Sequence, residues 1–213
     1  NQQTEPGLKG QDRISTNFVY DFLYPHPAAV LAFIENHDTD RFLGEGNNLP
    51  MLKQASTLLL TTRRIPQLYY GTEVMMNGVK SKSDGYVRKD FPGGWTGDAT
   101  NALTPAGRTK IQNECYDFYK TILNWRKGND VIAKGSMVQF MVQNGVYAYA
   151  RQYEGKTVFV MLNGTDAETT VPLKFYKEIL KNSKQGKDIL SGKAITFGEE
   201  LKMGPRESLV IEL

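Results

Sequence analysis

The sequence of 213 residues has one cysteine, Cys115, and only two histidines, His26 and His37. A single cysteine excludes an internal disulfide framework and a cysteine-rich metal site. The histidines lack HxxxH or HxH spacing, which disfavours a histidine metal site. Walker, zinc, dinucleotide and Ser-His-Asp patterns are also missing. Cys115 falls within an amphipathic helical pattern, so we expect it to be an inert core thiol.

Strong charge and long apolar runs are missing too. The chain has 26 Lys plus Arg against 23 Asp plus Glu, a net charge of +3. Spread over the whole chain, this surplus is too small for a phosphate-binding surface, so no nucleic acid partner is expected. No apolar run approaches the roughly 20 residues that span a bilayer, and the first residues lack a signal-peptide layout. We expect no transmembrane segment, and the compartment stays open.

Up to residue 128 the patterns of strand and helix alternate. A continuous apolar run over 29–34 is typical of a parallel strand buried on both faces, and 66–70 predicts a second short strand. Apolar residues at helical spacing predict helices over 49–62 and 111–125. A segment of roughly 35 residues without periodicity follows the second strand, and loops of that length are usually functional or disordered.

From residue 129 onward the apolar period becomes two. Asn144-Gly145 between two such runs is a strong signal for a β-hairpin. Short strands separated by turn residues are predicted over 137–142, 146–153, 157–162, 169–173, 188–190, 194–197, 200–203 and 208–213. This spacing is typical of an antiparallel sandwich of about seven or eight strands.

The first part contains only two clear strand-helix units. Their buried parallel strands would expose apolar faces if they stood alone, so we expect an exposed apolar seam. A closed eight-unit barrel takes about 250 residues, and 128 residues could supply only its closing portion. The chain therefore has the pattern of a piece of a larger protein.

Polar residues 35–38, Glu-Asn-His-Asp, directly follow the first predicted strand. Parallel α/β folds gather ligand-binding groups at the carboxyl ends of their strands. Asp38 can accept and His37 can donate hydrogen bonds to two neighbouring hydroxyls, which suits a sugar ring. The same side chains could instead satisfy backbone groups of the loop. Both interpretations stay open on the residues alone.

The long segment adds a second candidate set, with Asp84 and Arg88 four residues apart and Tyr86, Phe91 and Trp95 nearby. Its other charged residues are Lys80, Lys82, Lys89 and Asp90. Aromatic rings beside charged groups commonly hold sugars, by stacking and by bidentate hydrogen bonds from Arg. On composition alone, a solvated loop is the favoured alternative.

Three ordered motifs resemble the α-amylase family, glycoside hydrolase family 13. Residues 33–41, Phe-Ile-Glu-Asn-His-Asp-Thr-Asp-Arg, are similar to the family pattern Phe-x-x-Asn-His-Asp with a following Arg. Residues 69–73, Tyr-Tyr-Gly-Thr-Glu, resemble its Tyr-Tyr-Gly-x-Glu, and residues 84–88 resemble its substrate-binding Asp-x-x-x-Arg. The stretch 84–95 is closest to the neopullulanase and cyclomaltodextrinase branch.

The resemblance implies the fold class and domains. It implies the closing portion of a (β/α)8 TIM barrel over 1–128, followed by a C-terminal antiparallel β-sandwich over 129–213. As in the family, Asp38 and His37 would contact the sugar at the cleavage point as catalytic-site residues. Asp84 and Arg88 would bind the next glucose units, and Arg41 would contact sugar or fix the strand end.

The resemblance also exposes an absence. The family's nucleophilic Asp and acid/base Glu give a two-carboxylate retaining mechanism, and nothing in residues 1–28 resembles either signature. The resemblance therefore implies part of a retaining α-glucan hydrolase that is inactive alone and needs the N-terminal part of the same protein. Its partner would be an α-1,4- or α-1,6-linked glucan or a maltooligosaccharide. No cofactor is expected in this segment, and any calcium would bind in the upstream part.

The sequence leaves two alternatives open. The chain could be a non-catalytic carbohydrate-binding or structural module that keeps the sugar contacts. It could also be an inactive, transporter-associated relative that has lost the acids. The family resemblance favours a periplasmic or secreted bacterial protein, although the localisation is unknown.

Overall fold

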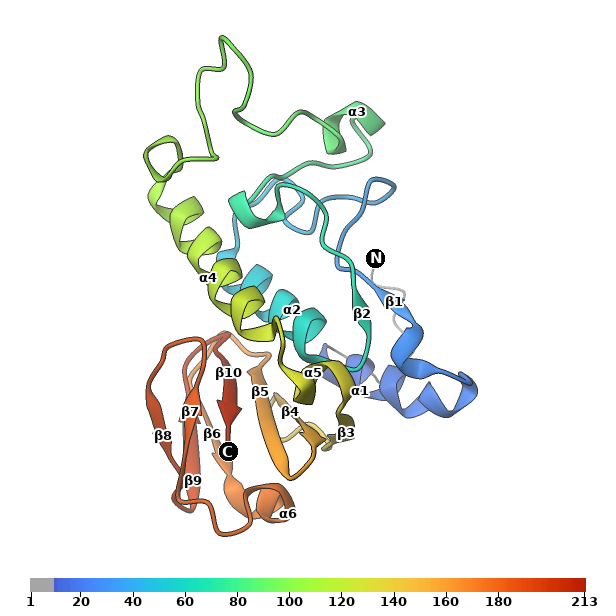
Figure 1. Ribbon diagram of the computed structural model, residues 1–213, viewed down its shortest axis with the longest axis vertical. Coiled ribbons are helices and arrows are strands. Elements are labelled where there is room, and N and C mark those ends of the chain that lie inside the picture. Colours follow the sequence, from blue (N-terminus) through green and yellow to red (C-terminus); the bar gives the residue numbers. More distant parts are fainter. Residues whose placement is uncertain (1–9) are drawn as a thin grey trace. The chain divides into compact units, whose positions relative to one another are not determined.

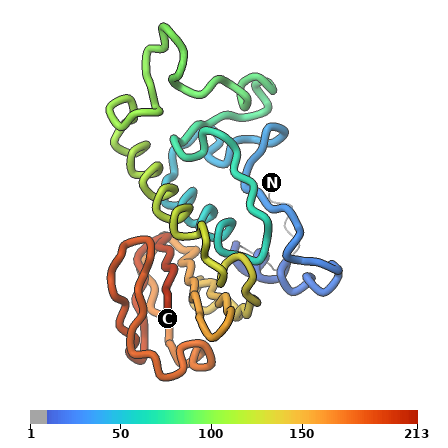
Figure 2. The backbone as a smooth tube through the Cα atoms, viewed as in Figure 1, coloured from blue at the N-terminus to red at the C-terminus, as the bar shows by residue number. Residues whose placement is uncertain are grey.

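A computed structural model describes residues 10–213, which divide into two compact units (Figure 1, Figure 2). The first nine residues of the predicted segment 1–128 lie outside the described part. The β-rich unit contains residues 10–30, 61–64 and 125–213, and the second unit contains 31–60 and 65–124. Every helix of the described chain is too short or too polar to span a bilayer.

The elements have the following bounds. The α-helices are α1 (Gln11–Val19), α2 (Leu49–Thr61), α3 (Asp84–Val87), α4 (Lys110–Arg126), α5 (Asp130–Lys134) and α6 (Lys177–Leu180). The strands are β1 (Leu31–Ala32), β2 (Ile65–Pro66), β3 (Ser136–Gln139), β4 (Val146–Tyr153), β5 (Lys156–Asn163), β6 (Thr169–Pro172), β7 (Gln185–Asp188), β8 (Ala194–Thr196), β9 (Glu200–Met203) and β10 (Ser208–Glu212). Short 3-10 helices cover Tyr20–Leu23, Pro27–Ala29, Thr72–Val74, Pro105–Gly107 and Leu173–Tyr176.

Strands β3 to β10 form two antiparallel sheets in the β-rich unit. Six strands make one sheet in the order β3-β4-β5-β10-β7-β8, and β6 pairs with β9 in the other. The predicted hairpin is confirmed: Asn144 and Gly145 have positive φ angles of 50° and 76°, and Gln143 pairs with Val146. Two consecutive residues with positive φ are what a type I′ turn requires. The mostly antiparallel character predicted for this part is thus confirmed.

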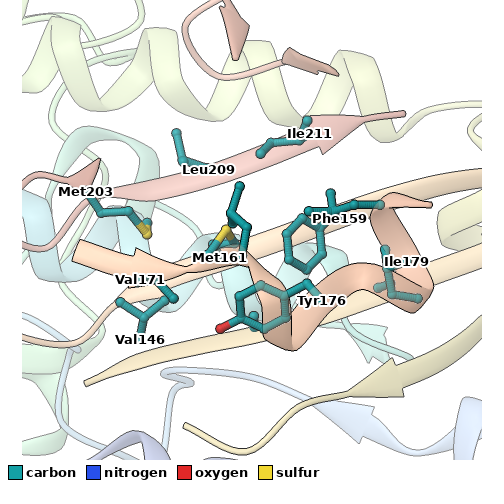
Figure 3. Close-up of a cluster of buried hydrophobic side chains, with 13 residues drawn as sticks. Val146, Phe159, Met161, Val171, Tyr176, Ile179, Met203, Leu209 and Ile211 are labelled. Atoms are coloured by element: carbon teal, nitrogen blue, oxygen red, sulfur yellow. The ribbon is translucent and has the colours of Figure 1, made fainter. Parts of the chain in front are cut away.

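A hydrophobic core joins the two sheets (Figure 3). Phe159 and Ile211 contribute from the large sheet, Val171 and Met203 from the β6-β9 pair, and Tyr176 from a 3-10 helix. Each of these five side chains is fully buried. Strands with period-two patterning bury one face in this way, so the predicted periodicity has a direct structural cause.

The opposite face of β4 is also buried, which a strand facing water would not show. Arg151 is 1% exposed and donates to the carbonyl oxygens of Gly135 at 2.7 Å and Thr61 at 3.0 Å. Tyr149 Oη lies 2.5 Å from the Thr61 hydroxyl. Burial lowers the pKa of the Arg151 guanidinium to about 10. These partners satisfy polar groups that would otherwise be costly to bury.

Residues 18–24, which are rich in aromatic side chains, form the end of α1 and the 3-10 helix that follows it. Asp21 is 5% exposed and is held by ion pairs with Arg63 and Arg64. The large apolar side chains around it remain exposed. These are Val19, Tyr20, Phe22, Leu23 and Tyr24.

In the second unit, β1 and β2 form a parallel pair in which Leu31 is opposite Ile65. Both strands are shorter than the apolar runs that predicted them. Leu31, Phe33 and Ile65 are 53%, 43% and 49% exposed, so the first run is not buried on both faces. The expected apolar seam is therefore present. Helices α2 and α4 match the predicted ranges closely, and their apolar faces are buried at positions such as Leu52 and Ile122.

Candidate functional site

The turn after β1 presents His37 and Asp38 to solvent. Asn36 Oδ1 accepts the backbone N–H of Asp38 at 2.8 Å, and Thr39 Oγ1 accepts that of Asn36 at 3.0 Å. Side chains of Asn and Thr commonly close turns in this way. The side chains of His37 and Asp38 are each 59% exposed, and His37 Nε2 lies 3.1 Å from Asp38 Oδ2. Asn36 therefore shapes the turn that carries the two predicted sugar contacts.

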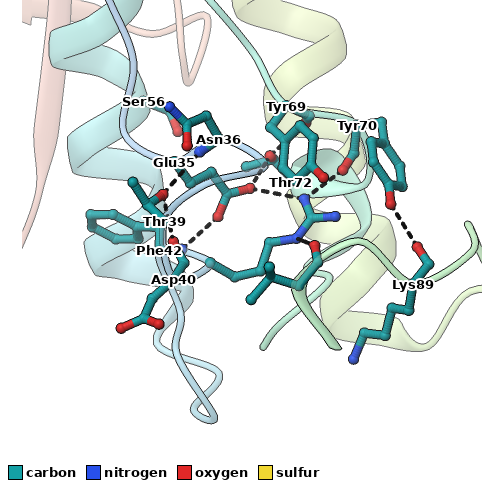
Figure 4. A network of polar contacts seen from close by, with 12 residues as sticks. Glu35, Asn36, Thr39, Asp40, Phe42, Ser56, Tyr69, Tyr70, Thr72 and Lys89 are labelled. Carbon is teal, nitrogen blue, oxygen red and sulfur yellow. Dashed lines mark hydrogen bonds and ion pairs between the residues drawn. The ribbon is translucent and has the colours of Figure 1, made fainter. Parts of the chain in front are cut away.

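The buried side chain of Glu35 holds this turn in place. This side chain is 2% exposed and accepts the backbone N–H of Phe42 at 2.5 Å (Figure 4). The hydroxyl of Thr72 also donates to Glu35, as Figure 4 shows. Glu35 thus connects the turn after β1 to the segment after β2, which contains the Tyr-Tyr-Gly-Thr-Glu motif.

Arg41 is the third member of a buried polar network with Glu35 and Thr72, which we call the frame. It is 1% exposed, and its Nη1 lies 3.3 Å from Glu35 Oε1 and donates to the Tyr70 carbonyl at 2.6 Å. Its Nε donates to the Val87 carbonyl at 3.0 Å, and the guanidinium lies 3.9 Å from the centre of the Tyr69 ring. These contacts favour the strand-end role for Arg41 over direct sugar contact.

Gly71 has a structural reason to be glycine. Its φ is +80°, and a Cβ at this position would lie 2.1 Å from Met76 Sδ. Any larger residue would force the Met76 side chain to move and would be strained at this positive φ. The Tyr-Tyr-Gly-Thr-Glu motif therefore contributes contacts to the frame: its tyrosine rings lie against the Arg41 guanidinium, and Thr72 donates a hydrogen bond to Glu35.

The short helix α3 positions the second pair of predicted residues, Asp84 and Arg88. Ser83 caps its N-terminus by accepting the Tyr86 N–H at 3.0 Å. Residues four apart on a helix lie on the same face. Arg88 follows at the C-cap, and its Nη2 lies 3.0 Å from Asp84 Oδ2.

The two segments meet at Arg88. Its Nη2 also lies 3.0 Å from Asp38 Oδ1, and its Nε donates to the His37 carbonyl at 2.9 Å. The structure thus brings together four of the five predicted site residues, His37, Asp38, Asp84 and Arg88, which we call the surface cluster. The fifth, Arg41, lies buried beneath them.

The surface cluster combines hydrogen-bond acceptors with a hydrogen-bond donor. Asp38 and Asp84 can accept hydrogen bonds, whereas Arg88 can donate. Arg88 is 40% exposed and Asp84 is 52% exposed, so their ion pairs are screened and a ligand can reach them. Among residues 10–213, no three His, Cys, Asp or Glu side chains lie close enough together to hold a metal ion.

Two further residues contact the surface cluster: Lys80, which the sequence places only among the charged residues of the long segment, and Asp40, which no motif assigns to sugar binding. Lys80 Nζ donates to the Asp38 carbonyl at 3.1 Å and lies 3.6 Å from Asp84 Oδ1. Asp40 accepts the backbone N–H of Lys80 at 2.6 Å. About 40 residues separate the two segments, so no local pattern signals these contacts.

Cys115 is outside this chemistry, as expected for a core thiol. It is fully buried in α4, and burial raises the pKa of its thiol to about 12. A neutral, inaccessible thiol is a poor nucleophile.

Comparisons with known proteins agree with the family resemblance. Residues 137–212 match the family model of the cyclo-malto-dextrinase C-terminal domain. An alpha-amylase from Niallia circulans is 31% identical over 176 residues, covering 79% of this chain and 29% of that protein. A cyclomaltodextrin glucanotransferase from Thermoanaerobacterium thermosulfurigenes is 31% identical over 184 residues, covering 83% and 22%.

Solved structures share the fold. The alpha-amylase from Geobacillus thermoleovorans, complexed with acarbose, has a TM-score of 0.73 at 22% identity and covers 95% of this chain and 42% of its own. The Nostoc punctiforme debranching enzyme has a TM-score of 0.71 at 17% identity, covering 98% and 39%.

The chain therefore belongs to the α-amylase family of glycoside hydrolases and transferases. Within that family it corresponds to a C-terminal part, and residues 137–212 form a cyclo-malto-dextrinase C-terminal domain. It spans less than a third of the length of the two curated relatives described above.

Proposed function

We propose that this chain is part of a retaining α-glucan hydrolase and supplies sugar-binding groups to its active site. The observation that carries the proposal is the position of Arg88, 3.0 Å from both Asp38 and Asp84. Two segments separated by about 45 residues thereby place exposed donors and acceptors side by side. Neighbouring sugar hydroxyls need such a set.

In this proposal each member of the surface cluster has a role. Asp38 accepts hydrogen bonds from the hydroxyls of the sugar at the cleavage point, and His37 contacts the same sugar. Hydrogen bonds of this kind strengthen as the ring distorts in the transition state. Asp84 and Arg88 bind the adjoining glucose units, while Arg41 holds the frame beneath.

The fold supports a place for the second unit in a barrel. Strands β1 and β2 are parallel, and α2 and α4 follow them in the chain. Leu31 and Ile65 remain largely exposed, as expected for strands of a barrel that closes with further strands. We propose that residues 1–128 form the closing portion of a (β/α)8 barrel.

The chain alone should not hydrolyse starch. Retaining glycosidases need a nucleophilic carboxylate and a carboxylic acid that protonates the leaving group. In this proposal the surface cluster binds sugar and supplies neither the nucleophile nor the proton donor, so the glycosidic bond would not be cleaved. Starch and pullulan assays of the purified chain should match a buffer blank. Turnover above the blank would show that the cluster has been given the wrong roles.

Binding is the direct test of the proposed site. Titrating maltohexaose against the chain should give a dissociation constant that rises at least tenfold in Asp38→Asn. Asp117→Asn, on the exposed surface of α4, is the matched control and should bind as the unmodified chain does. Equal affinity of Asp38→Asn and the unmodified chain would remove Asp38 from the sugar site.

A further inference from the structure

Lys80 connects both segments of the surface cluster through three contacts. Its backbone N–H donates to Asp40 Oδ1 at 2.6 Å, which fixes the backbone of residue 80 beside the turn after β1. Its Nζ then donates to the Asp38 carbonyl at 3.1 Å and lies 3.6 Å from Asp84 Oδ1. One residue thus contacts the turn that carries Asp38 and the helix that carries Asp84.

The charges show what these contacts do. Arg88 alone is shared by two carboxylates, which leaves one negative charge in excess. Lys80 supplies the second positive charge, so the two oxygens of Asp84 each face a different cation. Asp84 is therefore held on one side by Lys80 while the other side contacts Arg88.

We propose that Lys80 is a positioning residue for the sugar site, and this inference rests on the proposed function. Lys80 keeps Asp84 and the Asp38 turn at a fixed separation when Arg88 turns from the carboxylates to the hydroxyls of a bound α-glucan. Groups that are already ordered lose less entropy when they bind a ligand. Without Lys80, the glucan itself would have to order Asp84.

A neighbouring lysine provides a matched contrast. Lys82 pairs with Glu45, and its Nζ lies 4.7 Å from the centre of the Tyr86 ring. It is exposed to a similar degree, 51% against 44% for Lys80. Replacing Lys82 removes the same charge two residues away without removing a contact to Asp38 or Asp84.

The first test is a set of maltohexaose titrations with the 213-residue chain. Lys80→Met should weaken binding roughly 3- to 10-fold, the cost of ordering one side chain. Lys80→Arg should restore most of the affinity, because it keeps a cation within reach of Asp84. Lys82→Met should leave the affinity unchanged. Unchanged affinity in Lys80→Met would overturn the proposal.

A double-mutant cycle separates positioning from a general loss of charge or stability. If Lys80 acts through Asp84 as well as through the Asp38 turn, then Lys80→Met should weaken binding less in an Asp84→Asn background than in the unmodified chain. Losses that multiply in the double variant would contradict the proposal, since they would show that Lys80 acts independently of Asp84.

Amide hydrogen exchange of the sugar-free chain gives a second readout. Lys80→Met should speed exchange in residues 36–41 and 79–88 relative to Lys82→Met. If the unmodified chain binds no glucan, the proposed function fails, yet the exchange result still decides whether Lys80 positions Asp84. Unchanged exchange in both segments would overturn the inference even where glucan binding is found.

Discussion

The β-sandwich and the segment around β1 and β2 differ in how far they bury their apolar side chains. In the β-sandwich of β3 to β10, Phe159 and Tyr176 are fully buried and their ring centres lie 5.2 Å apart. In the second unit, Leu31, Phe33 and Ile65 are 43% to 53% exposed. Burial of apolar surface is the main favourable contribution to folding, whereas exposed patches mark surfaces that contact other groups. The sandwich has a closed core, whereas the segment around β1 and β2 leaves its apolar side chains exposed.

A second contrast lies within the unit that carries the surface cluster. The pair of Glu35 and Arg41 is almost completely buried, whereas Asp38 and Arg88 form a pair that is about half exposed. The first pair fixes the backbone, and the second remains accessible to a ligand. Similar ionic groups thus have different effects because their burial differs.

The largest expected effect tests the closed core. Phe159→Ala removes a ring that packs against Phe140 and Tyr176, and should lower the free energy of unfolding of the β-rich unit by about 3–5 kcal/mol. Urea unfolding followed by Trp125 fluorescence, in a Trp95→Phe background, measures this loss. Trp125 belongs to the β-rich unit and donates to Glu212, so its signal reports that unit.

Phe33→Ala is the matched control in the other unit. Because Phe33 is 43% exposed, its truncation should cost the second unit about 1 kcal/mol or less, as measured by the native-state alkylation rate of Cys115, which is buried in that unit. Equal losses in the two variants would contradict the contrast between the units, as they would show that Phe33 packs as tightly as Phe159.

The parts of the fold that were predicted from sequence depend on local patterns. Asn144-Gly145 adopts the predicted hairpin because two adjacent residues with positive φ suffice to turn the chain. Helix α4 likewise follows a local pattern, the helical spacing of its apolar residues. The strand predicted over 29–34 covers only Leu31–Ala32 in the structure, because strand length depends on pairing with neighbouring strands and not only on the apolar run.

The candidate site was predictable only in part. The motifs contain His37, Asp38, Asp84 and Arg88, and the structure places all four together. Helix α3 was missed because it has a single turn, although Ser83 at its N-cap offered a local signal. The contact of Lys80 with Asp38 joins segments about 40 residues apart, and such contacts follow from the fold rather than from sequence spacing.

The next effect concerns the buried pair beneath the site. Glu35→Gln should destabilise the second unit by about 3 kcal/mol, because it leaves the Arg41 guanidinium buried without a counter-charge. Cys115, buried in the same unit, should then react with an alkylating reagent about 100-fold faster under native conditions. Asp38→Asn, at the exposed pair, should leave the alkylation rate within a few-fold. Equal rates in Glu35→Gln and the unmodified chain would show that Glu35 does not stabilise this unit.

The smallest effect is a pH dependence in the β-rich unit. Burial by itself raises the pKa of Asp21, but hydrogen bonds and charges from Arg64 and Arg63 outweigh it and hold the pKa below its ordinary value. A carboxyl with a lowered folded-state pKa stabilises the fold above its unfolded pKa of about 3.9, and this contribution is lost as pH falls through the folded pKa. Asp21→Asn should therefore cost about 1–2 kcal/mol at pH 7, and the gap to the unmodified chain should close below about pH 4. Urea midpoints between pH 7 and pH 3 measure the gap, with Asp12→Asn in the exposed first turn of α1 as the control. A gap that stays constant over this range would mean that the ion pairs of Asp21 do not set the acid sensitivity of the unit.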